Sequence, residues 1–241
     1  MSEKELTLGA RAARTRAAIL EAAEEIFAER GFAATRLEDV AERVGIRRAS
    51  IVYYFKDKRE LYDAVLADVF EGLRVRIESA LSSLDPLPAR IEAGVSAWVD
   101  YVGGRPSFAR LLLREVANGV RDRDSALRQY TRPYFELIQK QVLERPPGGE
   151  LADVDPVHMA STIAGATVFY VAAMPTLVPE LGIDPTGPKG LAAHREQLLD
   201  IVRRLLGTDG SRSKKPGARG REGRPPTRSP SSRAGKRSPR R

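Results

Sequence analysis

The sequence predicts an all-α protein with about nine helices. An N-terminal three-helix domain containing a helix-turn-helix is expected to join a larger helical domain. Apolar residues recur three and four positions apart in most segments up to residue 206, as in amphipathic helices. Breaks rich in Gly and Pro separate these segments, and capping boxes at Thr35 and Asp57 mark two helix starts.

The first helix is expected from Ala12 to Arg30, after a disordered segment of residues 1–10. Its apolar stripe should pack on the next two helices and consists of Ile19, Ala22, Ala23, Ile26 and Phe27. Arg14 and Arg16 near its start could reach a neighbouring phosphate or could be solvated, and the sequence favours neither reading.

Thr35 and Glu38 form an S/T-x-x-E capping box, so the second helix is expected to start at Arg36. Gly45 then supplies the positive φ that a sharp turn requires. A third helix follows from Arg47 to Phe55. Together the two helices form a helix-turn-helix motif.

These two helices can cross closely because Ala41 has a small side chain, Gly45 makes the turn and the branched side chain of Ile51 fills the space at the crossing. The outer face of the third helix then carries Arg47, Arg48, Ser50, Tyr53 and Tyr54. Guanidinium, hydroxyl and phenol groups on an exposed helix suit a DNA major groove. The alternative is an ordinary helical pair with a solvated basic face.

The fourth helix is expected from Lys58 to Ser82 and links the two domains. A lysine at a helix N-terminus is disfavoured by the helix dipole, which indicates that Lys58 meets a phosphate. Five further helices are expected at residues 89–102, 107–118, 124–144, 156–178 and 189–206. Pro133 should kink the third of these five.

The segment from Pro156 to Val178 contains no charged residue apart from His158, if that is protonated. Such a run could suggest a membrane span. However, Pro175 interrupts it and no basic residues flank it. We expect a helix that is buried on all sides, and no membrane association.

The composition excludes several classes of site. The chain has no cysteine, so disulfides and thiolate metal sites are ruled out, and two histidines are too few for the usual histidine zinc centre. No phosphate-binding loop or nucleophile elbow is present. We expect no catalytic residues, metal or cofactor. The N-terminus does not resemble a signal peptide, which indicates a cytoplasmic protein.

The basic charge is concentrated in the last segment. Residues 207–241 hold 12 Lys or Arg and 2 Asp or Glu, a net +10 against +8 for the whole chain, so residues 1–206 sum to about −2. This segment is poor in apolar residues and should be a disordered basic tail. It could tether the protein to DNA non-specifically or have no role.

Residues 13–61 resemble the DNA-binding domain of the TetR family of bacterial transcriptional repressors. The matching motifs are Phe27-Ala-Glu-Arg-Gly31-Phe32, Thr35, Val40-Ala-x-x-Val44-Gly45-Ile46 and Tyr53-Tyr54-Phe55-x-Asp57-Lys58-x-Glu60-Leu61. Arg47 and Ala49 replace the usual Ser and Gly or Pro, and Val52 replaces a frequent aromatic. These departures change the expected operator, not the class.

The resemblance implies a division between residues 11–57, which bind DNA, and residues 58–206, which bind ligand and dimerise. Arg48 would read bases, with Arg47 and Ala49 beside it. Phosphates would be held by Thr35, Arg36, Ser50, Tyr53, Tyr54 and Lys58. By the same resemblance, the fourth helix moves when ligand binds.

A ligand cavity is expected among the helices between residues 89 and 178. Its candidate lining is Trp98, Tyr101, Phe108, Leu112, Tyr134, Met159, Phe169 and Tyr170. Each of these could instead be plain core. The apolar character of the set favours an uncharged, lipophilic effector.

The last two large helices, at residues 156–178 and 189–206, would form a homodimer interface by the same resemblance, or core helices of a monomer. A two-fold dimer matches a palindromic operator. We therefore expect a repressor that a small effector releases from double-stranded DNA, associated with the nucleoid when bound. Two alternatives stay open: an activator with the same domains, and an architectural protein driven by the basic tail.

Overall fold

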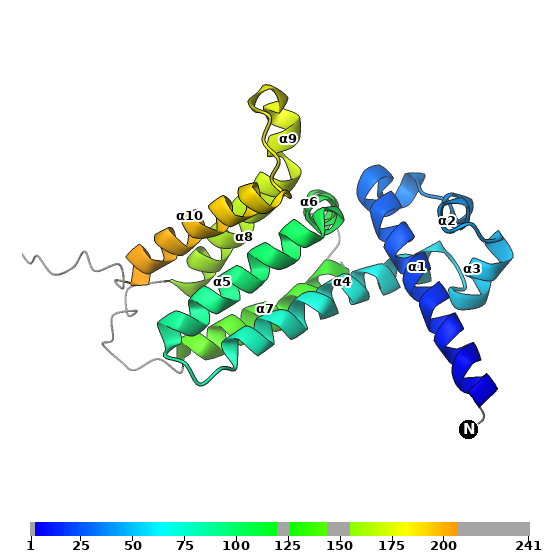
Figure 1. The fold of residues 1–241 in the computed structure, drawn as a ribbon, viewed down its shortest axis with the longest axis horizontal. Helices are drawn as coiled ribbons and strands as arrows, with labels where there is room; N and C mark the ends of the chain where they lie inside the picture. Colours follow the sequence, from blue (N-terminus) through cyan, green and yellow to red (C-terminus); the bar gives the residue numbers. More distant parts are fainter. Residues whose placement is uncertain (1–2, 120–125, 144–154, 207–241) are drawn as a thin grey trace, which may run out of the picture. The chain divides into compact units, whose positions relative to one another are not determined.

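The computed structural model describes residues 3–119, 126–143 and 155–206, and all regular structure within them is helical (Figure 1). This confirms the predicted all-α fold. The helices are α1 (Glu3–Ala34), α2 (Leu37–Val44), α3 (Arg48–Tyr54), α4 (Lys58–Leu81), α5 (Leu87–Gly104), α6 (Pro106–Gly119), α7 (Ala126–Leu143), α8 (Pro156–Ala172), α9 (Met174–Leu177) and α10 (Pro188–Leu206), with a 3₁₀ turn at Pro179–Leu181. The predicted basic tail, residues 207–241, lies outside the described residues.

Helix α1 is longer than predicted. It begins at Glu3, so residues 3–10 are helical rather than disordered. Glu, Lys and Leu, which dominate this segment, are strong helix formers and extend a helix that is already nucleated. Near its other end, Gly31 adopts φ 78° and ψ 169°, which kinks the chain before Thr35. Gly is suited to this position because it lacks a Cβ.

The helix predicted from Pro156 to Val178 is divided. Helix α8 ends at Ala172, and α9 starts anew at Met174. Pro175 explains the division, because it has no N–H to bond the preceding turn and its ring clashes with that turn's carbonyl. Pro133 lies inside α7, which continues through it. Among the described residues, no helix is both long and apolar enough to cross a membrane.

The prediction that this segment is buried on all sides is also wrong. One face of α8 is buried and consists of Ile163, Thr167, Val168 and Val171. The opposite face is exposed and consists of Val157, His158, Ser161, Thr162, Gly165 and Phe169. The absence of charged residues from α8 therefore does not mean that the whole helix is buried within one chain.

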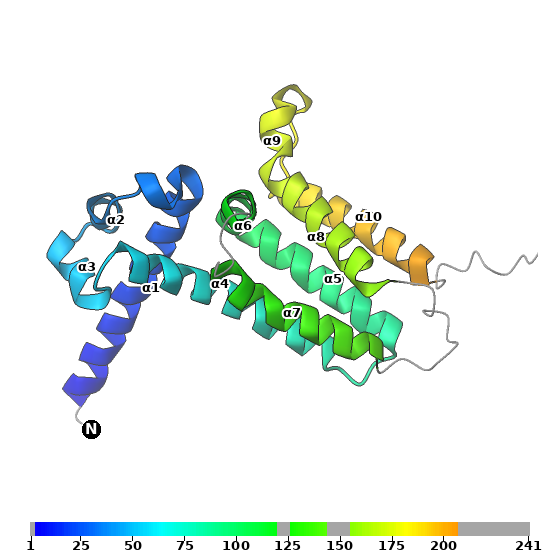
Figure 2. The same cartoon turned by 180° about the vertical axis from the view of Figure 1, so that it is seen from behind.

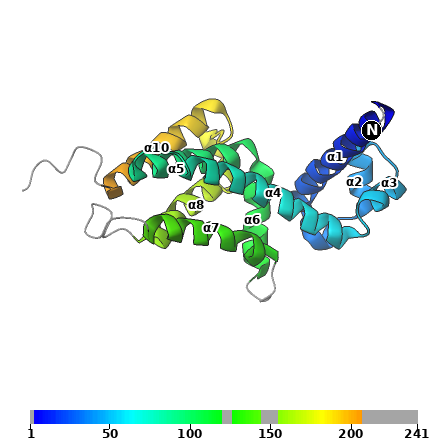
Figure 3. The same cartoon turned by 90° about the horizontal axis from the view of Figure 1, so that it is seen from below.

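The main core runs through α1, α2, α3, α4 and α6 and reaches the end of α8. Helix α4 contributes to this core from Leu61 to Leu73, and Ile77 packs against it. A second cluster forms where α5, α8 and α10 pack together (Figures 1 and 2). Seen from below, α8 lies between α5 and α7 (Figure 3).

A polar cluster joins α1 to α4 and α6. Glu24 of α1 is only 2% exposed. Its carboxylate accepts a 2.7 Å hydrogen bond from Nε of Arg105 and another of 2.7 Å from Oγ of Ser107. Arg105 also donates to Asp68 of α4 over 2.8 Å. Burial alone would lower the pKa of Arg105, but the hydrogen bonds to Glu24 and Asp68 outweigh it and raise that pKa.

Candidate DNA-binding surface and ligand pocket

Helix α2 begins one residue later than predicted. Its N-cap is Arg36, whose backbone N–H donates to Oδ2 of Asp39 over 2.9 Å, and this bond is the main reason that the pKa of Asp39 is lowered. Thr35 is 1% exposed, and its hydroxyl donates to the carbonyl of Gly31 over 2.8 Å. The side chain of Thr35 therefore fixes the α1 kink and is not free to hold a phosphate.

The turn between α2 and α3 has the predicted form. Gly45 adopts φ 73° and ψ 32°, and its N–H bonds the carbonyls of Ala41 and Glu42. This left-handed cap favours glycine. It directs the chain into α3, whose N-cap is Arg47.

Helix α3 presents a buried and an open face. Ile51 is fully buried and Phe55, its C-cap, is 2% exposed. They join the core that includes Val40 and Ala41 of α2. Of the predicted outward residues, Arg47, Arg48 and Tyr53 are exposed and Ser50 and Tyr54 are half-buried. Ala49, which was expected beside Arg48, is also exposed. The pattern of burial thus presents cations, phenols and a hydroxyl on one surface.

Arg48 does not stand alone on that surface. Its Nε lies 2.7 Å from Oε1 of Glu38 on α2, and both side chains are more than half exposed. The ring of Tyr53, 82% exposed, meets the ring of Tyr54 edge-on at 5.2 Å. The ion pair between Glu38 and Arg48 was not predicted, although both residues belong to the helix-turn-helix motif.

Lys58 is placed differently from the prediction. Its ammonium donates to the backbone carbonyls of Phe32, Ala33 and Thr35 over 2.7, 3.1 and 2.9 Å, and it lies 4.5 Å from the centre of the Phe32 ring. An ammonium has three protons, so all are used within the protein. Lys58 ties the kink after α1 to the start of α4 rather than facing outward to a phosphate.

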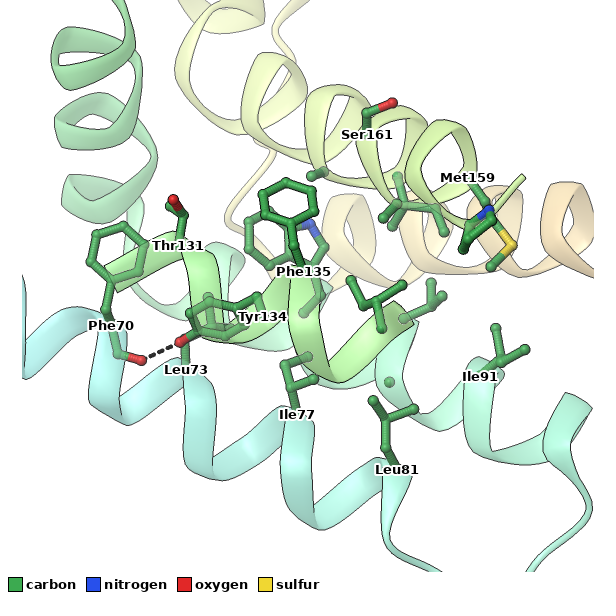
Figure 4. A pocket seen from close by; sticks show the side chains of 18 of the residues that line it. Phe70, Leu73, Ile77, Leu81, Ile91, Thr131, Tyr134, Phe135, Met159 and Ser161 are labelled. Atoms are coloured by element: carbon green, nitrogen blue, oxygen red, sulfur yellow. Dashed lines mark hydrogen bonds between the residues drawn. The ribbon is translucent and has the colours of Figure 1, made fainter. Parts of the chain in front are cut away.

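A pocket of about 470 Å³ opens among α4, α5, α6, α7 and α8 (Figure 4). That volume is within the usual range for small-molecule sites. Its lining is almost wholly apolar, and none of the described residues that line it is charged. The hydroxyl of Tyr134 donates to the carbonyl of Phe70 on α4 (Figure 4), and burial raises the pKa of Tyr134.

Five of the eight predicted lining residues lie at this pocket: Trp98, Phe108, Leu112, Tyr134 and Met159. The other three do not. Tyr101 is 5% exposed in the core and donates to the carbonyl of Val69. Phe169 is 50% exposed on the outer face of α8, and Tyr170 stacks on His194 at 4.3 Å.

The α4 side of the pocket and part of α7 were not predicted from the sequence. The residues concerned are Phe70, Leu73, Ile77, Leu81, Thr131, Phe135 and Ile138. The fourth helix was predicted only to link the two domains, and no lining residue was expected from it. No group of acids and histidines that could hold a metal ion occurs in the described part of the chain.

Two family models match the chain. The model of bacterial regulatory proteins of the tetR family matches residues 19–65, which include α2 and α3. The model of the tetracyclin repressor-like C-terminal domain matches residues 88–202. The chain belongs to the TetR family. This TetR-family protein is therefore a DNA-binding transcriptional regulator.

Individual relatives of the chain are also transcriptional regulators. The TetR-family chain is 29% identical to the HTH-type transcriptional regulator RutR of Escherichia coli (strain K12) over 161 residues, 66% of this chain and 74% of RutR. It is 29% identical to the HTH-type transcriptional repressor NicS of Pseudomonas putida over 203 residues, 80% of this chain and 92% of NicS. The ketosteroid transcriptional regulator KstR2 of Mycobacterium tuberculosis shares the fold, with TM-score 0.60, 22% identity and coverage of 80% of this chain and 93% of KstR2.

Proposed function

We propose that this protein is a repressor that acts as a homodimer on a palindromic operator and is released by a small, lipophilic effector. Helix α3 enters the major groove from each subunit. The observation that carries the proposal is the two-faced α3, which buries Ile51 and Phe55 and exposes its cations. Residues 11–57 contact DNA, and residues 58–206 bind the effector and dimerise, in the cytoplasm and at the nucleoid.

The exposed residues divide by chemistry. Arg48 reads bases with Arg47 and Ala49 beside it, because a guanidinium can make two hydrogen bonds to guanine. Ser50, Tyr53, Tyr54 and Arg36 hold phosphates. Thr35 and Lys58 are left out of this set, since their polar groups are engaged within the protein.

Helices α8 and α10 supply the dimer interface. The exposed face of α8 carries no Lys, Arg, Asp or Glu, and its Val157 and Phe169 are 53% and 50% exposed. On α10, Ile201 and Leu205 are each 42% exposed. Exposed apolar side chains on two helices, beside an α8 face without acidic residues, Lys or Arg, suit a self-complementary two-fold contact.

Helix α6 couples the pocket to the DNA-binding helices. Phe108 and Leu112 line the pocket. On the same helix, Arg114 donates to the carbonyls of Ala28 and Glu29 of α1 over 2.8 and 2.6 Å. An effector that binds better to one placement of α6 shifts the balance between DNA-competent and incompetent dimers.

The test is operator selection from random duplexes, followed by competition binding with Arg48→Ala. We expect the variant to bind its best site more weakly by about 1–3 kcal/mol and to tolerate substitutions at one position of each half-site. Arg43→Ala, which removes an exposed α2 arginine paired with Glu25, is the control. Equal selectivity of Arg48→Ala and wild type would contradict the assignment.

Two further measurements separate the alternatives. A protein truncated after residue 206 should keep its operator preference, whereas an architectural protein driven by the basic tail would lose most of its DNA binding. Transcription from a promoter that carries the selected operator should fall when the protein is added. A rise would make the protein an activator.

A further inference from the structure

Helix α3 exposes a valine among its charged and polar side chains. Val52 is 40% exposed, whereas Ile51 beside it is fully buried. Val52 lies outside both hydrophobic clusters that the described residues form. A β-branched residue also favours a helix less than Ala does. Neither core packing nor helix propensity therefore accounts for a valine at this position.

The neighbours of Val52 on α3 are residues that we propose meet DNA. Arg48 lies one helical turn earlier on the same side of the helix, because residues four apart share a face. Ala49, three positions before Val52, and Tyr53 are also exposed. The methyl groups of Ala49 and Val52 therefore form a small apolar area next to Arg48.

The major groove offers one apolar feature to such an area. Every base presents hydrogen-bonding atoms there, and thymine adds a C5-methyl group. A valine placed against a purine edge or the amino group of cytosine would displace water without replacing its hydrogen bonds, which costs free energy. Against the thymine methyl, the same side chain buries apolar surface and gains free energy. Valine in a helix also has one strongly preferred rotamer, so its methyl groups are ordered before DNA binds.

We propose that Val52 reads the C5-methyl group of a thymine in each operator half-site. This inference rests on the proposed function of α3. Four residues of helix separate Val52 from Arg48, a rise of about 6 Å. Successive base pairs are about 3.4 Å apart. With α3 along the groove, the thymine lies one or two base pairs from the guanine that Arg48 reads.

Replacing single thymines of the selected operator with deoxyuridine tests the contact, because deoxyuridine lacks only the methyl group. The full-length protein is titrated by fluorescence anisotropy, and the position at which Arg48→Ala relaxes selectivity locates the guanine. We expect deoxyuridine one or two base pairs from that guanine to weaken binding roughly fourfold per half-site, the value of one buried methyl group. At the same position, 5-methylcytosine should bind more tightly than cytosine.

Two variants assign the effect to Val52. Val52→Ala should bind the thymine and deoxyuridine operators with nearly equal affinity, because the methyl groups that make the contact are removed. Val75→Ala shortens a valine on α4 that is 52% exposed, and it should keep the fourfold ratio. Alanine is the strongest helix former, so both variants should keep their helices.

Selected half-sites without a thymine at that distance, a thymine-to-deoxyuridine affinity ratio near one, or a ratio that Val52→Ala leaves unchanged would each overturn the inference. These results would leave the proposed function standing, since that depends on operator binding and on Arg48→Ala. If no operator can be selected from random duplexes, the proposed function fails and the methyl contact fails with it.

Discussion

Arg48 lies on the exposed surface of α3 that we propose meets DNA, and a neighbour of opposite charge holds it there. Glu38 is 2.7 Å away, and both side chains are more than half exposed. Exposed ion pairs contribute only about 0–1 kcal/mol, so DNA can replace this one readily. The carboxylate itself would nevertheless face the phosphates and weaken binding.

Replacing Glu38 with Gln should therefore strengthen operator binding by roughly two- to fivefold at low salt, because it frees Arg48 and removes a like charge from the DNA surface. The gain should shrink as ionic strength rises. Fluorescence anisotropy at two salt concentrations measures both effects. Glu42→Gln removes the same charge from α2 without touching the Arg48 pair. If both variants gain equally, the pair has no role of its own.

Lys58 gives a second prediction at this scale. Lys58→Met should lower the free energy of unfolding by about 1–3 kcal/mol, because three carbonyls lose a partly buried charged donor. Thermal unfolding measures the change. Lys56→Met, two residues earlier and exposed, should be nearly neutral. Unchanged stability of Lys58→Met combined with weaker binding to every DNA would restore the phosphate contact expected from the sequence.

The sequence predicted which α3 residues face outward, because the four-residue spacing of Ile51 and Phe55 defines the buried side. It did not predict the partners of Lys58 or Thr35. The carbonyls that bind Lys58 lie 23 to 26 residues earlier in the chain, at a kink that depends on Gly31. Such contacts depend on how α1 and α4 pack, which local patterns do not encode.

At the scale of elements, the joint between α1, α4 and α6 depends on a buried charge. Glu24 is nearly inaccessible and is paired with Arg105. Arg105→Met should destabilise the protein by about 3–5 kcal/mol, since it leaves a buried carboxylate unpaired. Chemical denaturation measures this loss, with Arg110→Met, an exposed α6 arginine, as the control.

The double variant Glu24→Leu/Arg105→Met tests whether the unpaired carboxylate causes the loss of stability in Arg105→Met. It removes both charges, so it should recover a large part of the stability lost in Arg105→Met. Losses that simply add would show that the carboxylate and the guanidinium do not depend on each other.

Helix boundaries were predicted well where Pro and Gly act locally, as at α4, α6 and α10. Helix boundaries were predicted less well where packing between helices determines where a helix ends. Helix α5 continues through Gly103, where a Cβ would lie 2.3 Å from Cδ1 of Leu191, so the absence of a side chain there lets α10 approach. From the sequence, the same Gly103-Gly104 pair indicated the end of a helix.

Binding to a palindromic operator needs two subunits, which we propose meet through α8 and α10. Phe169→Asp should shift the protein from dimer to monomer and weaken operator binding at least tenfold, because an aspartate would be buried at the two-fold contact. Analytical ultracentrifugation measures the assembly state. Leu84→Asp, which changes a fully exposed side chain in the loop after α4, is the control. A Phe169→Asp protein that stays dimeric would place the interface elsewhere.

The sequence alone predicted the helical fold and the family, because these are encoded in local spacing and in a compact motif. It predicted the pocket only in part. Phe169 and Tyr170 have the same apolar character as Met159, yet only Met159 lines the cavity. Which side of α8 meets the cavity follows from its packing against α5, α6 and α7, and composition does not reveal this.

The most direct test of the central claim is a hydroxyl-radical footprint of the full-length protein on DNA flanking its own coding region, at low ionic strength. If α3 of each subunit reads DNA, two half-sites related by a two-fold axis should be protected, about one helical turn apart or a multiple of it. Arg47→Ala/Arg48→Ala should abolish this protection at the same protein concentration. Uniform protection that survives this double substitution, or no binding to any duplex, would contradict the claim that α3 reads DNA.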